Sequence, residues 1–487
     1  MIWLGRSGKA TPPIARWEDA VVAVRTVAIV LAAGAGSRLG GGKMLAHVQG
    51  TPILQHVLDR VAEAGVGEAV VVLGVDADAV EDAIEWRSEV RVRNPDPGRG
   101  LSSSLQIAMA ALDPAVDAVL IVLGDQPLIA PETITALLAA GTDPDRPIVV
   151  PVYRSDRGRN PVLVRRQAFD LVGQVSGDRG LGPVISAHPE LAAEVPVDAD
   201  NPDVDTAADL ARVVEAVWAA RVKANRDQVE RVREVPDGAD FYAPVRSLFR
   251  ADPTRTDDPV LNVLVDLVRP GETWLDVGAG AGRFALPIAR ALDPSGGSVI
   301  AVDTSESMIE ALREMADDYD IENIRTLLAR WPIADPMSVA GDVALIAHVG
   351  YDIEAIGPFI DALEVATQRL CVAVLMEGAP AAAADPFWPP VHDEARVPLP
   401  ALSDFVELLQ ARGREPSVAT VEVEPRRFDS RDALGGFAIR QLWIDPAGAK
   451  WARFQTALEA LTEQHADGWV IRERPMNRIG VVTWRPG

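Results

Sequence analysis

A glycine-rich segment that ends in two cations follows the apolar run at residues 27–31. Gly34 and Gly36 come first, and Arg38 and Lys43 follow them. Glycines let backbone N–H groups approach phosphate oxygens closely, and cations offset the negative charge of those oxygens. Such a segment, placed directly after a buried strand, is suited to holding a polyphosphate. A bare turn between a strand and a helix would leave Arg38 and Lys43 without a role.

Two common phosphate loops do not fit this segment. A Walker A loop requires glycine at position 37 and Ser or Thr at position 44, where this chain has Ser37 and Met44. A dinucleotide fingerprint that starts at Gly34 requires its third glycine at position 39, which is Leu39. The segment therefore belongs to another class of nucleotide-binding loop.

A carboxylate in the first half of the chain could hold a metal ion, and another precedes a predicted helix. Asp125 follows the apolar run 118–123, and Asp205 precedes the predicted helix 207–220. A carboxylate at the carboxyl end of a parallel strand can hold Mg²⁺ against a triphosphate. The alternatives are structural, because Asp125 could be a turn residue before a proline and Asp205 could cap the helix.

A second glycine-rich loop, with the spacing G-x-G-x-G, occupies residues 278–282 and is followed by Arg283, where a dinucleotide fingerprint requires glycine. The next predicted strand, 298–303, ends in Asp303, which lies 23 residues beyond Gly280. A carboxylate at that position can accept hydrogen bonds from both hydroxyls of a ribose. The loop predicts a second nucleotide-type cofactor site, for which NAD is one alternative.

Strand-like and helix-like segments alternate along the chain. Nearly continuous apolar strands are expected at residues 69–73, 118–123 and 147–151, and a helix with an apolar face at 53–61. This alternation is typical of a mainly parallel sheet with helices on both faces. The predicted fold class is therefore α/β, with two doubly wound Rossmann-like domains.

Composition limits the classes of function. The chain has 487 residues, 48% of them hydrophobic, and a formal net charge of −24. A chain this acidic is a poor match for a nucleic-acid binder, so nucleic acid is not expected as a partner. One cysteine and six histidines exclude a disulfide framework and an ordinary Cys/His zinc site. No apolar run has the length of a membrane span, and residues 1–25 lack the apolar segment of a signal peptide, so we expect a cytoplasmic protein with a disordered extension at 1–25.

Residues 31–43 resemble the signature L-A-A-G-x-G-x-R-x-G-x-x-K of the MobA-like nucleotidyltransferases, with every fixed position present. Further segments, at 100–104, 124–127, 158–161 and 177–180, are similar to the branch that makes the cytosine dinucleotide form of the molybdenum cofactor. The resemblance implies transfer of CMP from CTP to molybdopterin, dependent on Mg²⁺, with release of pyrophosphate. One departure is Gly42, where that branch often has Asn or Asp, and a sugar phosphate or another phosphorylated metabolite stays open as the acceptor.

The same resemblance implies roles for individual residues. The nucleotide would be bound by the start of the loop, which comprises Leu31, Ala32, Ala33, Gly34 and Gly36. The implied catalytic residues are Arg38, Lys43 and Asp125. The implied metal ligands are Asp125 and Asp205.

The second half of the chain is similar to the class I methyltransferases that use S-adenosylmethionine. This resemblance implies a cofactor site formed by Asp276, Gly278, Gly280, Gly282, Asp303 and Trp331. His348, after the apolar run 342–346, is expected near the transferred methyl group. The methyl acceptor is expected to be a small molecule that the sequence does not identify.

We therefore predict a nucleotidyltransferase domain at residues 26–220 and a methyltransferase domain at 221–487, the latter with an N-terminal lid segment at 221–256. The leading hypothesis is a bifunctional enzyme. The alternative is that one domain is catalytic and the other is a nucleotide-binding or scaffolding module. The sequence leaves the oligomeric state open.

Overall fold

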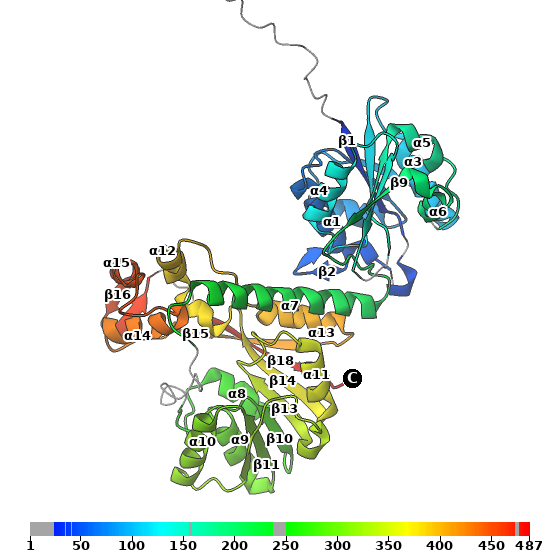
Figure 1. Ribbon diagram of the computed structural model, residues 1–487. Helices are drawn as coiled ribbons and strands as arrows, with labels where there is room; N and C mark the ends of the chain where they lie inside the picture. The colour runs from blue at the N-terminus through cyan, green and yellow to red at the C-terminus, as the bar shows by residue number, and fades with distance from the viewer. Residues whose placement is uncertain are drawn as a thin grey trace, which may run out of the picture. The chain divides into compact units, whose positions relative to one another are not determined.

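The computed structural model describes residues 24–34, 36–39, 41–154, 158–178, 180–236, 250–472 and 477–487 (Figure 1). The predicted extension, apart from its last two residues, and residues 237–249 of the predicted lid lie outside this set. The chain forms two compact units. The first extends to Asp203 and the second from Val204 to Gly487, with residues 38–40 and 46–52 grouped with the second.

The first unit is a seven-stranded sheet covered by helices, in the order β5-β4-β1-β6-β8-β7-β9. All neighbouring strands are parallel except at β8, which is antiparallel to β6 and β7. The strands are β1 (Thr26–Ala32), β4 (Ala69–Leu73), β5 (Val90–Arg93), β6 (Ala118–Leu123), β7 (Ile148–Val152), β8 (Val162–Arg165) and β9 (Ala192–Pro196). The helices are α1 (Ile53–Glu63), α2 (Ala77–Ala83), α3 (Leu101–Ala110), α4 (Pro131–Ala140), α5 (Phe169–Val172) and α6 (Gly182–Ala187).

The alternation of side chains along β1 shows why the sheet is covered on both faces. Ala28 and Val30 belong to one core cluster, which also contains residues of α1 and α4. Val27 and Ile29 belong to a second cluster, which contains residues of α3 and α6. Successive strand residues point to opposite faces, so a strand buried on both faces has an uninterrupted apolar sequence.

The second unit contains another seven-stranded sheet, in the order β12-β11-β10-β13-β14-β18-β15. Its first five strands are parallel, and β18 is antiparallel to both β14 and β15. The strands are β10 (Thr273–Val277), β11 (Ser298–Asp303), β12 (Ile324–Leu328), β13 (Gly341–Ala347), β14 (Thr367–Met376), β15 (Ser417–Val423) and β18 (Asn477–Trp484). Its helices include α8 (Pro259–Asp266), α9 (Ala285–Leu292), α10 (Glu306–Asp318), α11 (Ile356–Val365) and α13 (Leu402–Ala411). Both sheets confirm the predicted fold class.

A separate group of short elements in the second unit has its own core (Figure 1). It consists of η10 (Pro380–Phe387), α12 (Trp388–His392), α14 (Arg431–Leu442), α15 (Trp451–Leu461), β16 (Thr462–His465) and β17 (Gly468–Ile471). Phe387, Trp388 and Phe454 are fully buried in it. The second unit therefore has two hydrophobic cores, one around its sheet and one within this group of short elements.

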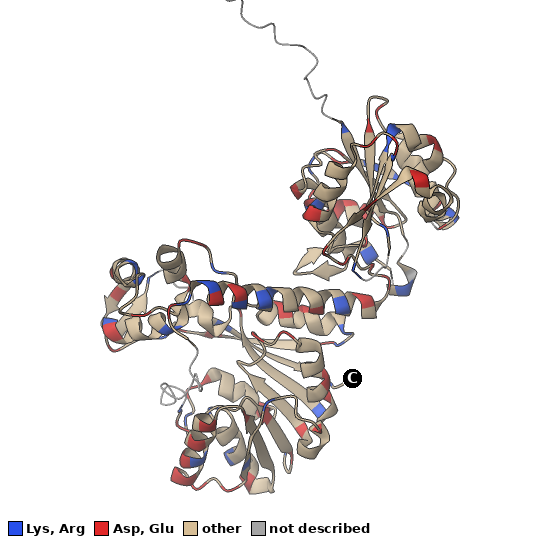
Figure 2. Cartoon of the chain, in the orientation of Figure 1, with Lys and Arg blue, Asp and Glu red and all other residues tan. Residues whose placement is uncertain are grey.

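The long helix α7 (Ala207–Val232) corrects the predicted domain boundary. It continues without a break through position 220, and it belongs to the second unit throughout. Its apolar face, with Val214 and Trp218, is buried, and the Trp218 indole N–H donates to the Ile353 carbonyl at 2.9 Å. Charged residues of both signs alternate along the helix (Figure 2). The apolar stripe of this charged helix therefore makes it a packed element of the second unit.

A capping box begins α7. The Thr206 hydroxyl accepts from the Asp209 N–H at 3.2 Å, and the Asp209 carboxylate accepts from the Thr206 N–H at 2.8 Å. This reciprocal pair satisfies backbone donors that have no partner within the helix.

In the part of the chain that the structure describes, no helix is long and apolar enough to span a bilayer.

Candidate functional site

The first glycine-rich loop follows the carboxyl end of β1, and its shape depends on Gly36. Gly36 has a φ of +57°, and a Cβ on it would lie 2.6 Å from the Lys43 Cβ. The Gly41 N–H donates to the Gly36 carbonyl at 3.0 Å, which closes the loop on itself. Only glycine allows this close return of the chain. The loop therefore positions Lys43 directly against Gly36.

The residues predicted to bind the nucleotide lie in two settings. Leu31 and Ala32 are the last residues of β1, and both are buried. Ala33 is also buried, whereas Gly34 is exposed at the start of the loop. The exposed backbone that could meet a ligand thus begins at Gly34.

Lys43 and Asp125 meet beneath this loop. Lys43 Nζ lies 2.5 Å from Asp125 Oδ2, and the Lys43 residue is only 6% exposed. Asp125 follows β6, which is parallel to β1, so both residues lie at the same edge of the sheet. Parallel sheets bind ligands at this edge. The structure therefore brings together two of the three predicted catalytic residues.

Asp125 retains a carboxylate oxygen that could bind a cation. Its Oδ1 is buried and has no hydrogen-bond partner among the described residues. Within that set no group of three or more His, Cys, Asp or Glu residues is arranged to hold a metal ion. Mg²⁺ is commonly bound by one or two carboxylates together with substrate phosphates and water. A single buried carboxylate oxygen fits that mode of binding.

Arg38 and Asp205 form a pair of their own. Arg38 Nη2 lies 3.5 Å from Asp205 Oδ2, and the Arg38 side chain is 72% exposed. An exposed ion pair of this kind contributes little to stability, which leaves the guanidinium able to exchange partners. The roles of Arg38 in catalysis and of Asp205 as a metal ligand stay predictions.

A buried network of side-chain amides lies beside Asp125 and was not predicted from the sequence. Gln126 donates to Asp203 Oδ1 at 2.6 Å and accepts from Asn201 Nδ2 at 2.9 Å. Asn201 also donates to the Asn160 carbonyl at 3.3 Å. The network ties the segment after β9 to the residue next to Asp125. Its one sequence signal was a polar residue, Gln126, placed between Asp125 and a proline.

Two of the predicted polar segments meet at the start of α3. Gly100 has a φ of +93°, and a Cβ there would lie 2.5 Å from Asp178 Oδ1. The Leu101 N–H donates to that same oxygen at 3.2 Å. Asn94, at the end of β5, donates to the Ser103 and Ser104 hydroxyls at 2.9 Å each. These hydrogen bonds hold the start of α3 against Asp178 and Asn94 at the carboxyl edge of the sheet.

In the second unit the glycine loop after β10 is shaped by three positive φ angles, of +77° at Gly278, +55° at Gly280 and +83° at Gly282. A Cβ on Gly278 would lie 2.4 Å from Val349 Cγ2, and one on Gly282 would lie 2.8 Å from Leu286 Cγ. The Gly280 N–H donates to Asp303 Oδ2 at 2.8 Å. The predicted carboxylate thus lies directly against the predicted loop.

Asp276 lies beneath this loop as the penultimate residue of β10 and is buried. Burial, reinforced by the charge of Asp303, raises the pKa of Asp276 to about 7. Asp276 Oδ1 has no hydrogen-bond partner among the described residues. A buried acceptor without a partner is costly, so this site fits a ligand that brings hydrogen-bond donors, as S-adenosylmethionine does.

Trp331 lies inside the second unit rather than on an open cofactor surface. It is 8% exposed, and its indole N–H donates to the Phe359 carbonyl at 3.3 Å. The polar atom of the side chain is therefore used within the core. Only the small exposed part of the ring could make the cofactor contact that the sequence predicts.

His348 follows β13 with a φ of +57°, and its backbone N–H donates to the Val374 carbonyl at 2.8 Å. Burial, reinforced by the charge of Arg283, lowers the pKa of His348 to about 4. Its Nδ1 atom is buried without a partner among the described residues. Nearby, the Tyr351 hydroxyl accepts from the Met376 N–H at 2.7 Å, and burial raises the pKa of that phenol. At neutral pH the imidazole is uncharged, and its lowered pKa makes it a weak proton acceptor.

Comparisons with known proteins agree with both resemblances. A family model described as a MobA-like NTP transferase domain matches residues 28–192, and one described as a methyltransferase domain matches residues 275–353. The chain thus contains a MobA-like NTP transferase domain and a methyltransferase domain, as the two glycine-rich loops predicted.

Individual relatives cover only parts of the chain. The Bifunctional protein GlmU of an Exiguobacterium species is 40% identical over 114 residues, which are 23% of this chain and 25% of that protein. This chain therefore spans about a quarter of the length of the curated relative. The crystal structure of Rv0371c from Mycobacterium tuberculosis is 31% identical, with a TM-score of 0.36, and the match covers 40% of this chain and 99% of that one. The YcgJ protein from Bacillus subtilis is 14% identical, with a TM-score of 0.32, and the match covers 47% of this chain and 98% of that one.

Proposed function

We propose that the MobA-like domain transfers a nucleotidyl group from a nucleoside triphosphate to a phosphorylated acceptor, and that the methyltransferase domain methylates a small molecule with S-adenosylmethionine. The observation that carries the first activity is the buried pair of Lys43 and Asp125 beneath a glycine-rich loop. Both reactions are expected in the cytoplasm.

The nucleotidyl transfer is an in-line displacement. An oxygen of the acceptor phosphate attacks the α-phosphorus, the bond to the β-phosphate oxygen breaks, and pyrophosphate leaves. Reactions of this type depend mainly on positioning and on stabilisation of charge. Lys43, Arg38 and the backbone N–H groups from Gly34 onward are suited to holding the departing pyrophosphate.

Asp125 is the residue that we propose to hold Mg²⁺, through the carboxylate oxygen that has no protein partner. Asp205 is proposed as a second ligand, after it leaves Arg38. When bound, the metal neutralises charge on the phosphate oxygens. Lys43 has the complementary task of balancing the carboxylate while the metal is absent.

We propose CTP and molybdopterin as the substrates, on the motifs at residues 31–43, 100–104, 158–161 and 177–180. The second candidate acceptor is a sugar phosphate or another phosphorylated metabolite. Gly42 favours it, because the molybdopterin branch often has Asn or Asp at that position. The reaction type is the same for both acceptors.

For the methyl transfer we propose that Asp303 binds the ribose of the cofactor and that Asp276 accepts from one of its N–H groups. At Gly280 no atom lies within 4 Å of the position that a Cβ would take, so the cofactor could approach the backbone there. A nucleophilic atom of the acceptor bonds to the methyl carbon as the S–CH₃ bond breaks. S-adenosylhomocysteine leaves, and the acceptor releases its proton to water.

Pyrophosphate release tests the first activity. The full chain is assayed with Mg²⁺ and each of CTP, GTP, ATP and UTP, with molybdopterin, with a sugar 1-phosphate, or with no acceptor. Release with CTP and molybdopterin, lost in Lys43→Ala, supports the proposal. The matched control is Arg25→Gln, since Arg25 is also ion-paired but precedes the first residue of β1, at the opposite edge of the sheet. If pyrophosphate is released with the sugar 1-phosphate but not with molybdopterin, the assignment moves to the second candidate acceptor. If no combination of triphosphate and acceptor releases pyrophosphate, the proposed activity is refuted.

A further inference from the structure

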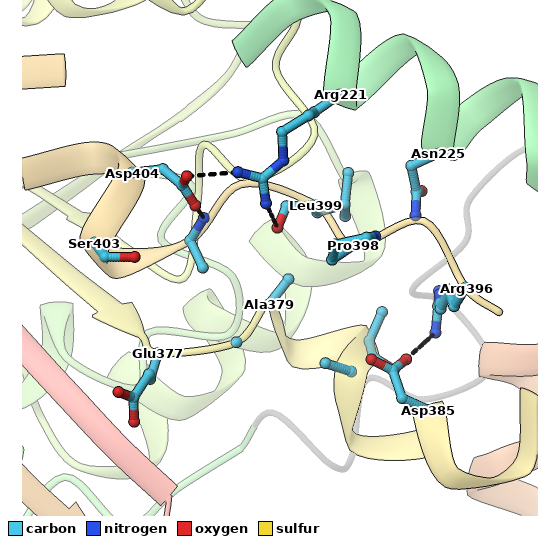
Figure 3. Close-up of a pocket in the computed structure, with 14 residues that line it drawn as sticks. Arg221, Asn225, Glu377, Ala379, Asp385, Arg396, Pro398, Leu399, Ser403 and Asp404 are labelled. Carbon is cyan, nitrogen blue, oxygen red and sulfur yellow. Dashed lines mark hydrogen bonds and ion pairs between the residues drawn. The ribbon is translucent and has the colours of Figure 1, made fainter. Parts of the chain in front are cut away.

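A polar pocket of about 360 Å³ lies in the second unit, beyond the carboxyl end of β14 (Figure 3). Its walls come from α7, from residues 377–385 and from residues 396–404. This volume is within the range of small-molecule sites. The residues that line this pocket have no role in the two proposed activities as described so far.

The pocket shares an edge of the sheet with the glycine loop of the methyltransferase domain. Strand β13 lies between β10 and β14, and all three are parallel, so their carboxyl ends meet. Adjacent strands are about 4.8 Å apart, which places the ends of β10 and β14 roughly 10 Å from each other. The loop after β13 is tied to the end of β14 through Tyr351 and Met376, and Glu377 of the pocket follows directly. A ligand in this pocket would therefore lie at the same edge of the sheet as the proposed cofactor.

Arg396 is the residue in this pocket that is best arranged to bind a ligand. Its side chain is only 8% exposed, and its Nη1 donates to Asp385 Oδ1 at 3.0 Å and to the Ala381 carbonyl at 2.9 Å. The guanidinium lies over the Trp388 ring, 4.6 Å from its centroid. These three contacts hold the guanidinium plane in one orientation.

The opposite side of the same guanidinium is available. Among the described residues no acceptor bonds Nε or Nη2, and neither atom is among the fully buried polar atoms that lack a partner. Both atoms therefore have some access to the cavity that Arg396 lines. Two neighbouring N–H groups of a guanidinium match the two oxygens of a carboxylate.

The charges around the pocket favour a carboxylate over a phosphate. Arg221 on the facing wall is already occupied by Asp404 and the Leu399 carbonyl (Figure 3). The lining contains two arginines but three acidic residues, which are Glu377, Asp385 and Asp404. A doubly charged anion would meet this excess of negative charge more strongly than a single carboxylate would. Burial lowers the pKa of Arg396 even though Asp385 is already its anionic partner, so the charge of this guanidinium is poorly solvated.

We infer that this pocket binds the methyl acceptor and that the acceptor is a small carboxylic acid whose carboxylate pairs with Arg396. The inference rests on the proposed methyl-transfer function of the second domain. The group to be methylated lies on the part of the acid that extends from Arg396 toward His348.

Binding to the full chain tests this inference without knowledge of the natural acceptor. The probes are propionate and benzoate, each paired with its uncharged amide, together with inorganic phosphate. Dissociation constants are measured by calorimetry or ligand-detected NMR for the wild type, Arg396→Lys and Arg431→Lys. Arg431 is the matched control, because it also lies over a tryptophan, 4.5 Å from the Trp469 ring centroid, but it does not line the pocket. S-adenosylhomocysteine is titrated into the same samples.

At least one carboxylate should bind the wild type about tenfold more tightly than its amide and more tightly than phosphate. Arg396→Lys should lose that preference while Arg431→Lys keeps it. Equal affinity for acid and amide in the wild type, or tighter binding of phosphate, overturns the inference even if Arg396→Lys fails to fold. Binding of S-adenosylhomocysteine without carboxylate preference overturns the inference alone. Carboxylate preference without binding of S-adenosylhomocysteine refutes the methyl-transfer proposal, and with it the assignment of the acid as a methyl acceptor.

Discussion

Lys43 and Asp125, 82 positions apart in the sequence, form a part-buried ion pair at the edge where β1 and β6 end. In the absence of a nucleotide, each compensates the charge of the other. Burial of either charge alone would be costly. A nucleotide with its metal must therefore replace this pair with new partners for both residues.

The first prediction concerns the stability of that pair. Lys43→Met leaves the Asp125 carboxylate without its cation and should lower the local free energy of unfolding by about 1–3 kcal/mol. The double variant Lys43→Met/Asp125→Asn should recover part of the loss, because no charge remains. Hydrogen exchange of the β1 and β6 amides measures both effects. Equal exchange in the wild type and Lys43→Met would show that the pair contributes nothing.

The second prediction separates two glycines of the cofactor loop. Both Gly278 and Gly280 have positive φ angles, so alanine at either position costs about 1–2 kcal/mol. At Gly278 the new Cβ would also lie 2.4 Å from Val349, whereas at Gly280 no atom lies within 4 Å. Gly278→Ala should therefore be less stable than Gly280→Ala by a further 1–3 kcal/mol or so. Urea unfolding followed by tryptophan fluorescence measures the difference, and equal midpoints would contradict it.

The third prediction is the pH dependence caused by Asp276. Its pKa is raised to about 7 in the folded chain, from about 4 when unfolded, so between these values only the folded state binds the proton. This contribution to stability is complete below pH 4 or so and is lost as the pH rises to about 7, by about 4 kcal/mol in total. Asp276→Asn should lack this loss. The free energy of unfolding at pH 5 and pH 8 should differ between the wild type and the variant, and parallel profiles would refute the raised pKa.

The fourth prediction concerns His348, whose shift has the opposite direction. Its pKa is lowered to about 4, so the unfolded state binds a proton that the folded state does not between pH 4 and the usual value near 6.5. Stability from this group is present above pH 6.5 or so and is lost as the pH falls to about 4. NMR titration should show a neutral His348 ring at pH 5.5, with His348→Asn identifying its signal. A ring that titrates near pH 6.5 would contradict the burial of this group.

The sequence predicted the elements and the loops better than the partners of their side chains. The apolar runs identified β4 and β6, and the glycine spacing identified both loops, because these features are local. The network of Gln126, Asn201 and Asp203 joins residues about 75 positions apart, and no local pattern encodes it. The hydrogen bond from the Trp331 indole N–H to the Phe359 carbonyl also joins residues 28 positions apart, and the role of Trp331 as a cofactor contact stays a prediction.

The domain boundary shows the same limit. The boundary was predicted after residue 220, yet the apolar stripe that holds α7 in the second unit starts before it, at Val213. Likewise, the antiparallel pairing of β18 with β14 and β15 depends on contacts that end close to the last residue of the chain.

The most direct test of the central claim follows the α-phosphate itself. The full chain is incubated with CTP labelled at the α-phosphorus, Mg²⁺ and molybdopterin or a sugar 1-phosphate, and the products are separated. The label should appear in the nucleotidylated acceptor, with at least a hundredfold slower transfer in Lys43→Ala and an unchanged rate in Arg25→Gln. Transfer that is equally fast in Lys43→Ala, or label that never leaves the nucleotide with any acceptor or triphosphate, would contradict the assignment of this domain as a nucleotidyltransferase that acts through Lys43 and Asp125.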